Sequence, residues 1–411
     1  MAQLNITLNQ AEIQALLLDD RGEAFKTILQ TSLNSFLQAE SCEQLKAAPY
    51  ERSGERTDSR NGCRDRTLNT RIGRITLHVP RHRNVPFKTL LFDNYSRSEA
   101  ALVAGMAELV VNGVSTRKVR RVMETLCGTS FSKSSVSEVC KDLDKAVNEF
   151  RSRPLNGYYP FLTVDATYFK VRENGRIVSK AFMIAYATHE DGHREILGFS
   201  VYANESVYTW TDFLTSLKKR GLTGPLMITS DAHEGLRKAI GKVFPNAAWQ
   251  RCQFHFIRNI IDKTPKKFQT GLSTELQEMF HCRTPEEARK IRDRIMGDYG
   301  DIAEAAMECL DEGFEDAMTV MMLPEGLRRY YRTSNHIERL NKELKRRSKV
   351  IGIFPNENSL LRLMGSVLIE RHDALLAGRA VFSPESLAAV MKSDVPSKLL
   401  TIAKEQQLKA A

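Results

Sequence analysis

Three acidic residues lie where a divalent metal ion could be held. Asp165 interrupts the apolar stretch "FLTVDATYFKV" (161–171), Asp231 closes "PLMITSD", and Glu338 lies within "HIERLNKELKRRSK". An unpaired carboxylate in a buried strand is costly to desolvate, so Asp165 needs a cation, a hydrogen-bond network or a metal ion. Carboxylate oxygens suit Mg²⁺, which Mn²⁺ can replace. Two such ions about 3.5–4 Å apart can drive an in-line phosphoryl displacement.

Alternating strands and helices are predicted around the two aspartates. Residues 161–171 are rich in strand formers, and Asn174–Gly175 is a hairpin turn signal. "KAFMIAYATHE" and "REILGFSVYA" continue as strands, a helix follows over 207–220, and "PLMITSD", "AHEGLRKAIGKVF" and "NAAWQRC" add strand, helix and strand. This order predicts an α/β protein with a ribonuclease-H-like catalytic core, with Asp165 on its first strand and Asp231 at the end of its fourth.

The remaining part of the predicted core lies in the last fifth of the sequence. Residues 151–251 form its first part, whereas 252–330 are polar and helical without a strand pattern. The further helix that the core needs is predicted at 336–349. We therefore expect 252–330 to be an all-helical insertion, and 331–411 to hold the last part of the core and the C-terminal helices.

Two glutamates of the 336–349 helix compete for the place of third metal ligand. Glu338 and Glu343 are five positions apart and so point about 140° apart at ~100° per residue. The side of Glu338 is polar and cationic, with Asn335, Asn341, Lys342 and Lys345. Arg339 and Arg347 flank Glu343 at four-residue spacing, which favours a surface ion pair. We therefore expect Glu338 to complete the site with Asp165 and Asp231.

The N-terminal third is predicted to bind DNA. Residues 1–50 have helical periodicity, and 51–95 hold many arginines and a strand in which Ile75, Leu77 and Val79 alternate with basic or polar residues. Residues 96–150 resemble a helix-turn-helix with Ser115 and Ser132 as N-caps, although any packed helical hairpin looks similar. The candidate DNA contacts, including two on the late helix, are Arg71, Arg74, Arg117, Lys118, Lys133, Lys342 and Lys345.

Composition narrows the class of protein. The 411-residue chain is long enough for several domains and carries a net charge of +10. That charge indicates either a polyanionic partner such as nucleic acid or simply a basic, solvated surface. No apolar run is long enough for a membrane span, and the first residues lack a signal-peptide pattern. The seven cysteines include no CxxC pair, which indicates a reducing, cytoplasmic setting without disulfides.

Three further residues near the predicted site have open roles. Cys252 and His255 in "CQFH" could be half of a zinc site, but no second pair follows at useful spacing, and His281 and Cys282 are isolated. We therefore expect Cys252 and His255 to have a structural role without zinc. His233, two residues past Asp231, could cap a helix, contact phosphate or orient a carboxylate, and a local structural role is favoured.

Taken together, several stretches resemble the Mutator-like transposases of bacterial insertion sequences. They are "VDATYFKVR", "LGFSV…ES…TW", "SDAHEGL", "RCQFHFIRN" and "TSNHIERLNKELKRR", in family order over about 155–350. The resemblance implies a DDE transposase with a helical insertion, and it maps the catalytic acids onto Asp165, Asp231 and Glu338. It also implies a recurring Cys-x-x-His motif near the active site, here Cys252 and His255.

The resemblance gives the expected function. Such an enzyme binds the terminal inverted repeats of its element, cleaves a DNA strand and joins the freed 3′-hydroxyl to target DNA in one Mg²⁺ site. We expect a homodimer or larger assembly on DNA, because two ends must be joined, and a bacterial cytoplasmic, nucleoid-associated protein. Two alternatives remain: a structure-specific nuclease with a ribonuclease-H-like fold, such as a junction resolvase, and a non-catalytic DNA-binding regulator derived from a transposase.

Overall fold

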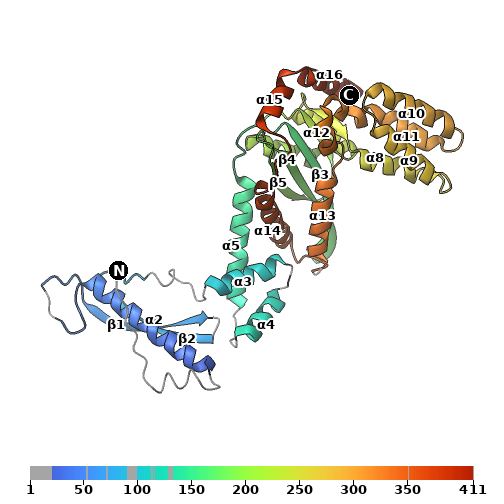
Figure 1. Cartoon of the computed structure of the whole chain (residues 1–411). Coiled ribbons are helices and arrows are strands. Elements are labelled where there is room, and N and C mark those ends of the chain that lie inside the picture. The colour runs from blue at the N-terminus through green and yellow to red at the C-terminus, as the bar shows by residue number, and fades with distance from the viewer. Residues whose placement is uncertain are drawn as a thin grey trace. The chain divides into compact units, whose positions relative to one another are not determined.

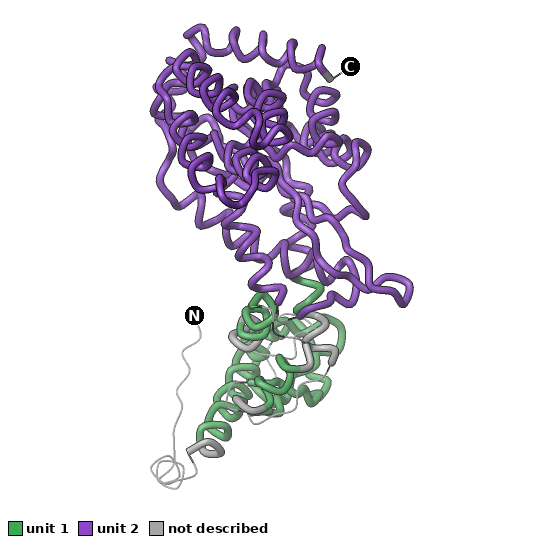
Figure 2. Tube along the Cα trace, turned by 90° about the vertical axis from the view of Figure 1, so that its right-hand side faces the viewer, with its two compact units in different colours: residues 1–142 green, residues 143–411 purple. Residues whose placement is uncertain are grey.

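The computed structural model divides the chain into two compact units, residues 1–142 and 143–411 (Figure 2). This division is coarser than the six segments expected from the sequence, which stay a prediction. The described residues are 21–51, 54–70, 73–89, 100–112, 114, 116–127, 133–349 and 351–410.

The first unit begins with a helix packed on a hairpin. Helix α2 (Arg21–Leu45) covers strand β2 (Gly73–His82), which pairs antiparallel with β1 (Arg60–Thr70). Ile75, Leu77 and Val79 are buried with Leu37 of α2, and Arg74 on the opposite face of β2 is exposed. The predicted half-buried strand with a basic outer face is therefore confirmed.

Three helices follow the hairpin. They are α3 (Ala100–Val111), α4 (Thr116–Cys127) and α5 (Lys133–Ser152), and α5 ends in the second unit. Three helices thus occupy residues 96–150, the region expected to resemble a helix-turn-helix, and α4 and α5 begin directly after the two expected N-caps. The predicted N-caps Ser115 and Ser132 lie outside the described residues, so that motif stays a prediction.

A five-stranded mixed sheet forms the centre of the second unit (Figure 1). Its strand order is β5-β4-β3-β6-β7; the first three are antiparallel neighbours, and β6 and β7 run parallel to β3. Asn174 and Gly175 both have positive φ, 48° and 78°, as the predicted hairpin turn between β3 and β4 requires. The strands are β3 (Phe161–Glu173), β4 (Arg176–Thr188), β5 (Arg194–Tyr202), β6 (Met227–Ser230) and β7 (Ala248–Arg251).

Helices cover both faces of this sheet. On one face, α6 (Val207–Lys219) and α7 (Glu234–Val243) share a buried core with Leu162 and Val164 of β3, to which α6 contributes Trp210 and α7 contributes Ile240. On the other, α13 (Asn335–Ser348) packs on β3, and α14 (Glu357–Leu376) packs on β3 and β5. Because successive side chains of a strand alternate between faces, Asp165 points toward α13 whereas Val164 enters the α6–α7 core.

The helical stretch between β7 and α13 has its own core. Its members are α8 (Gln253–Asp262), α9 (Gln269–Phe280), α10 (Pro285–Tyr299), α11 (Glu304–Met318), the 3₁₀ turn η1 (Thr319–Met322) and α12 (Glu325–Tyr331). Phe256 of α8 and Phe314 of α11 are fully buried in that core. Gly313 permits this close approach, since a Cβ there would lie 2.6 Å from the Phe256 ring.

Two helices, α15 (Pro384–Lys392) and α16 (Val395–Ala410), end the chain. Both contribute to a core that includes Phe161 of β3. Among the described helices, none combines the length and apolar character that crossing a bilayer would take.

Candidate active site

Three residues of interest lie on, or just past the ends of, neighbouring strands of the sheet. Thr163 of β3 pairs with Thr229 of β6, so Asp165 and Asp231 each lie two residues further along neighbouring parallel strands. Ser230 pairs with Arg251 of β7, which puts Cys252 level with Asp231. The carboxyl ends of parallel strands are where α/β sheets usually place their ligand sites.

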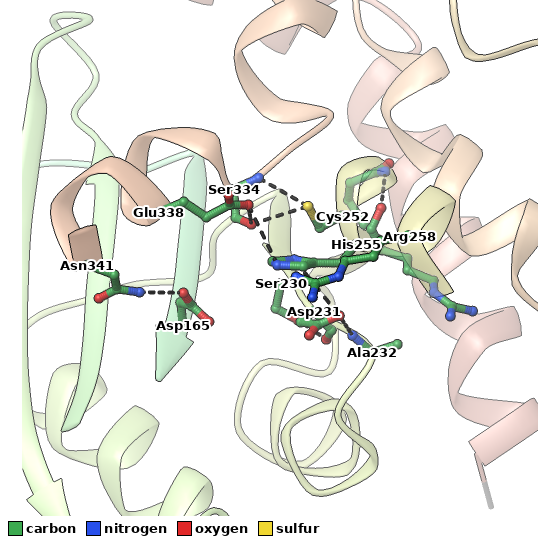
Figure 3. Close-up of polar contacts among 12 residues, drawn as sticks. Asp165, Ser230, Asp231, Ala232, Cys252, His255, Arg258, Ser334, Glu338 and Asn341 are labelled. Carbon is green, nitrogen blue, oxygen red and sulfur yellow. Dashed lines mark hydrogen bonds and ion pairs between the residues drawn. The ribbon is translucent and has the colours of Figure 1, made fainter. Parts of the chain in front are cut away.

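Asp165 is held by a hydrogen bond from α13. Its Oδ2 accepts from Asn341 Nδ2 at 2.7 Å (Figure 3). Surrounding protein removes water from the carboxyl group, and this burial raises the pKa of Asp165 to about 7. The negative charges of Asp231 and Glu205 act in the same direction, and His255 opposes them. A cation at this place would therefore be strongly favoured.

Asp231 lies at the turn between β6 and α7. Its Oδ1 accepts from the backbone N–H of Ala232 at 2.7 Å, and its side chain is 47% exposed. His233 is the N-cap of α7, and its Nδ1 accepts from the backbone N–H of Leu236 at 3.3 Å. A helix cap was one of the three roles considered for His233 from the sequence.

Glu338 lies in the first turn of α13, where the helix dipole favours an acidic side chain. Its Oε1 lies 3.5 Å from Ser334 Oγ and 3.7 Å from His255 Nε2. The side chain is 19% exposed, so most of it is buried but solvent still reaches it.

His255 lies between two of the three acids (Figure 3). Its Nε2 faces Glu338, and its Nδ1 lies 4.0 Å from Asp231 Oδ1. A hydrogen bond with Cys252, together with the charges of Cys252, Asp231 and Glu338, raises the pKa of His255 to about 9 despite partial burial. Without a metal ion the imidazolium therefore holds Asp231 and Glu338 on either side of one positive charge.

Cys252 ties the start of α8 to the start of α13. The thiol is fully buried, and its Sγ accepts from the backbone N–H of Ser334 at 3.3 Å and from Ser334 Oγ at 3.2 Å. Ser334 in turn reaches Glu338. The Cys-x-x-His motif therefore contacts the same helix turn that carries the third acid.

Glu343 has a different environment from Glu338. Arg346 and Arg347 donate to its carboxylate at 2.7 and 2.9 Å, and these bonds lower the pKa of Glu343 to about 2. Its side chain is only 16% exposed. The expectation of a surface ion pair was wrong on this point, because Arg347 of the pair is itself buried.

The structure describes the side chains of only some of the candidate DNA-contact residues. Lys342 and Lys345 are exposed on α13, the helix of Glu338, and Arg74 and Lys118 are exposed in the first unit. Arg71 lies outside the described residues, as do the side chains of Arg117 and Lys133.

Two neighbours of the acids were not assigned roles from the sequence. Asn341 was placed on the polar face of Glu338 but not paired with Asp165, and Glu205 was noted only inside a motif. Asn341 follows Glu338 by three residues, one helical turn, which is a usable signal. Glu205 precedes the helix cap Ser206, and only the fold brings it near Asp165.

Comparison with known proteins identifies the family. The model of the family described as "Transposase, Mutator family" matches residues 1–378. The chain belongs to this Mutator family of transposases. The resemblance inferred from the sequence is thereby confirmed. The matched range of this Mutator-family transposase includes Asp165, Asp231, Glu338 and the Cys-x-x-His motif.

Individual Mutator-family relatives match over most of their length. A transposase for insertion sequence element IS256 in transposon Tn4001, from Staphylococcus aureus, is 42% identical over 377 residues, 91% of this chain and 96% of that protein. One for ISRM5 from Rhizobium meliloti is 41% identical over 351 residues, 85% and 88% of the two chains. One for IS1081 from Mycobacterium tuberculosis is 38% identical over 400 residues, 95% and 96%.

Proposed function

We propose that this Mutator-family transposase moves an insertion sequence by DDE chemistry: Mg²⁺-dependent strand cleavage at the element ends, then strand transfer to target DNA. The observation that carries the proposal is the placement of the three acids around His255, which lies 4.0 Å from Asp231 and 3.7 Å from Glu338 and whose charge also acts on Asp165. The strand order β5-β4-β3-β6-β7 with α6 and α7 between its last strands supports a ribonuclease-H-like core. The helices α8–α12 would then be an insertion before the third acid.

The residues fit a hard cation. Three carboxylates supply oxygen donors, and burial raises the pKa of Asp165, with smaller contributions from the negative charges of Asp231 and Glu205. In addition, Asn341 Oδ1 is buried and has no hydrogen-bond partner within the described part of the chain. Asp165, Asp231 and Glu338 would hold Mg²⁺, or Mn²⁺ in its place. Bound there, the ions would activate a water or a 3′-hydroxyl and stabilise the leaving oxygen.

The chain's own groups would prepare this reaction. Asn341 fixes the rotamer of Asp165, and the register of β3 and β6 fixes the spacing of the two aspartates. His255, with Nε2 at 3.7 Å from Oε1, holds Glu338 toward the same space. Lys342 and Lys345, exposed on the helix of Glu338, would contact phosphates of the DNA beside the reacting bond.

The proposal extends to the DNA and to the assembly. We infer that the first unit recognises terminal repeats through the basic face of β2 and the α4–α5 region, with Arg74 and Lys118 among its contacts. Joining two ends calls for at least two catalytic sites, so a homodimer or larger assembly on DNA is expected.

One assay separates this function from its alternatives. The full chain is incubated with Mg²⁺ and supercoiled DNA bearing the element ends, and the products are mapped. Cleavage at the ends followed by strand transfer supports the proposal. Cleavage without transfer would favour a structure-specific nuclease, and binding without cleavage would favour a non-catalytic regulator.

A further inference from the structure

A second donor set lies beside the three carboxylates. The ligand atoms of Cys252, His255 and Glu338 all lie within 4.8 Å of one another, and the described part of the chain offers no other such His, Cys, Asp and Glu group. We propose that these three side chains form a binding site for a thiophilic divalent cation, Zn²⁺ being the ion that fits best. The inference stands apart from the proposed Mg²⁺ chemistry, because sulfur and imidazole donors select zinc over magnesium.

The spacing of His255 and Glu338 fits a shared ion better than a direct bond. Nε2 and Oε1 are 3.7 Å apart, which is too long for a hydrogen bond. Zinc binds nitrogen and oxygen at about 2.0–2.2 Å in tetrahedral geometry, which separates two donors by roughly 3.4 Å. The two atoms therefore need to move only a few tenths of an ångström to bind one ion.

The sulfur of Cys252 is held in a fixed position by hydrogen bonds. The sulfur is buried, lies at the N-terminal end of α8 and accepts from both the backbone N–H and the hydroxyl of Ser334. The same bonds fix the direction in which the sulfur faces the other two donors.

His255 has a neighbour suited to orient it. Its Nδ1 is buried, finds no hydrogen-bond partner among the described residues and lies 4.0 Å from Asp231 Oδ1. A zinc-bound histidine usually donates its second ring N–H to a carboxylate, and Asp231 faces Nδ1 but would have to move closer to accept that N–H. Three protein ligands leave a fourth position of the tetrahedron for water.

This inference reverses the expectation drawn from the sequence. Zinc was excluded there because no second Cys or His pair follows Cys252 and His255. The structure supplies a carboxylate instead, since Glu338 comes from a helix that begins more than 80 residues later. Bound zinc would share Glu338 with the proposed magnesium site and would fix the turn between α12 and α13.

Zinc content of the purified full chain tests the proposal. The protein is stripped with EDTA, equilibrated with Zn²⁺, desalted and measured by elemental analysis. We expect about one zinc per chain, lost in Cys252→Ser and in His255→Ala but retained in Cys282→Ser. Cys282 is the matched control because it adjoins His281 away from this site. Equal zinc in wild type and Cys252→Ser would overturn the proposal, as would no zinc in the wild type.

Cobalt adds a readout on the wild-type protein, which does not depend on the folding of any variant. Co²⁺ bound to wild-type protein should show a thiolate-to-cobalt charge-transfer absorption, and Glu338→Gln should weaken Co²⁺ binding by at least about tenfold. Absence of that absorption in the wild type would contradict a cysteine ligand. Neither measurement uses DNA or cleavage, so a failure here is separate from a failure of the proposed transposition chemistry.

Discussion

Asn341 of α13 donates from Nδ2 to Oδ2 of Asp165 at 2.7 Å, and this bond links the helix of the third acid to the strand of the first. The bond accounts in part for the presence of an acidic residue in an otherwise apolar strand. The bond does not fully offset the cost of burying the charged carboxylate, because burial still raises the pKa of Asp165 to about 7.

Removing the amide should therefore impair cleavage without changing the fold. For Asn341→Ala we expect strand cleavage to fall about 10–100-fold and the Mg²⁺ concentration for half-maximal rate to rise, because Asp165 loses its fixed rotamer. Cleavage rates across a Mg²⁺ titration measure both. If Asn341 only packs the helix, the Mg²⁺ dependence will stay that of the wild type.

Asp165 should make the metal-free protein less stable at high pH. An unfolded Asp titrates near 3.9, whereas folded Asp165 titrates at about 7. Between those values the folded chain keeps a proton that the unfolded chain has lost, so the free energy of unfolding falls as pH rises and levels off above 7. The Asp165→Asn side chain cannot ionise and still offers an oxygen atom to Asn341. The free energy of unfolding of this variant should therefore not fall in this way as the pH rises.

Thermal unfolding in EDTA checks this consequence. Asp165→Asn should melt above the wild type at pH 8, and the difference should shrink toward pH 4. Added Mg²⁺ should raise the melting temperature of the wild type but not of the variant. Asp262→Asn, on the surface of α8, is the control. A pH-independent difference would mean that the Asp165 carboxyl group is not desolvated.

Substitutions of Glu338 and Glu343 should have different effects on cleavage and on stability. Glu338→Gln should stop cleavage, and in protein stripped of metal ions with EDTA its melting temperature should change little. Glu343→Gln should keep most activity but destabilise the chain by about 1–2 kcal/mol, because it breaks charged hydrogen bonds to Arg346 and Arg347. Cleavage rates and melting curves of the two variants together decide this. The reverse ranking in the cleavage assay would make Glu343 the metal ligand.

Lysines near the site and basic residues of the first unit should contribute differently to DNA binding. Lys342→Ala and Lys345→Ala should weaken binding equally for terminal-repeat and scrambled DNA, and each should reduce the salt slope by about 0.9. Arg74→Ala should reduce the preference for terminal repeats. Titrations of the full-length variants at several salt concentrations test this, and an unchanged preference in Arg74→Ala would argue against recognition by β2.

Local patterns made much of this fold predictable. The alternation of Ile75, Leu77 and Val79 fixes the buried face of β2, and Asn174–Gly175 fixes the β3–β4 turn. The order of elements from β3 to β7 follows from the same kind of signal. Each of these features depends on residues within a few positions of one another.

Such local patterns could not predict contacts between segments that are far apart in the sequence. Ser334 meets Cys252 across 82 positions, and this contact brings His255 to Glu338. Spacing along the chain could not indicate that pairing, so the sequence suggested half a zinc site where the structure assembles three donors. The burial of Glu343 was missed for the same reason, since Arg371 from α14 also lies near it.

The central claim is that Asp165 and Asp231 hold the catalytic ions. The most direct measurement is Mg²⁺-dependent cleavage of DNA bearing the element ends by Asp165→Ala and Asp231→Ala, beside a mobility-shift assay of the same proteins. The account predicts that both variants bind the DNA as the wild type does and that neither cleaves it. Undiminished cleavage by either variant would contradict the account.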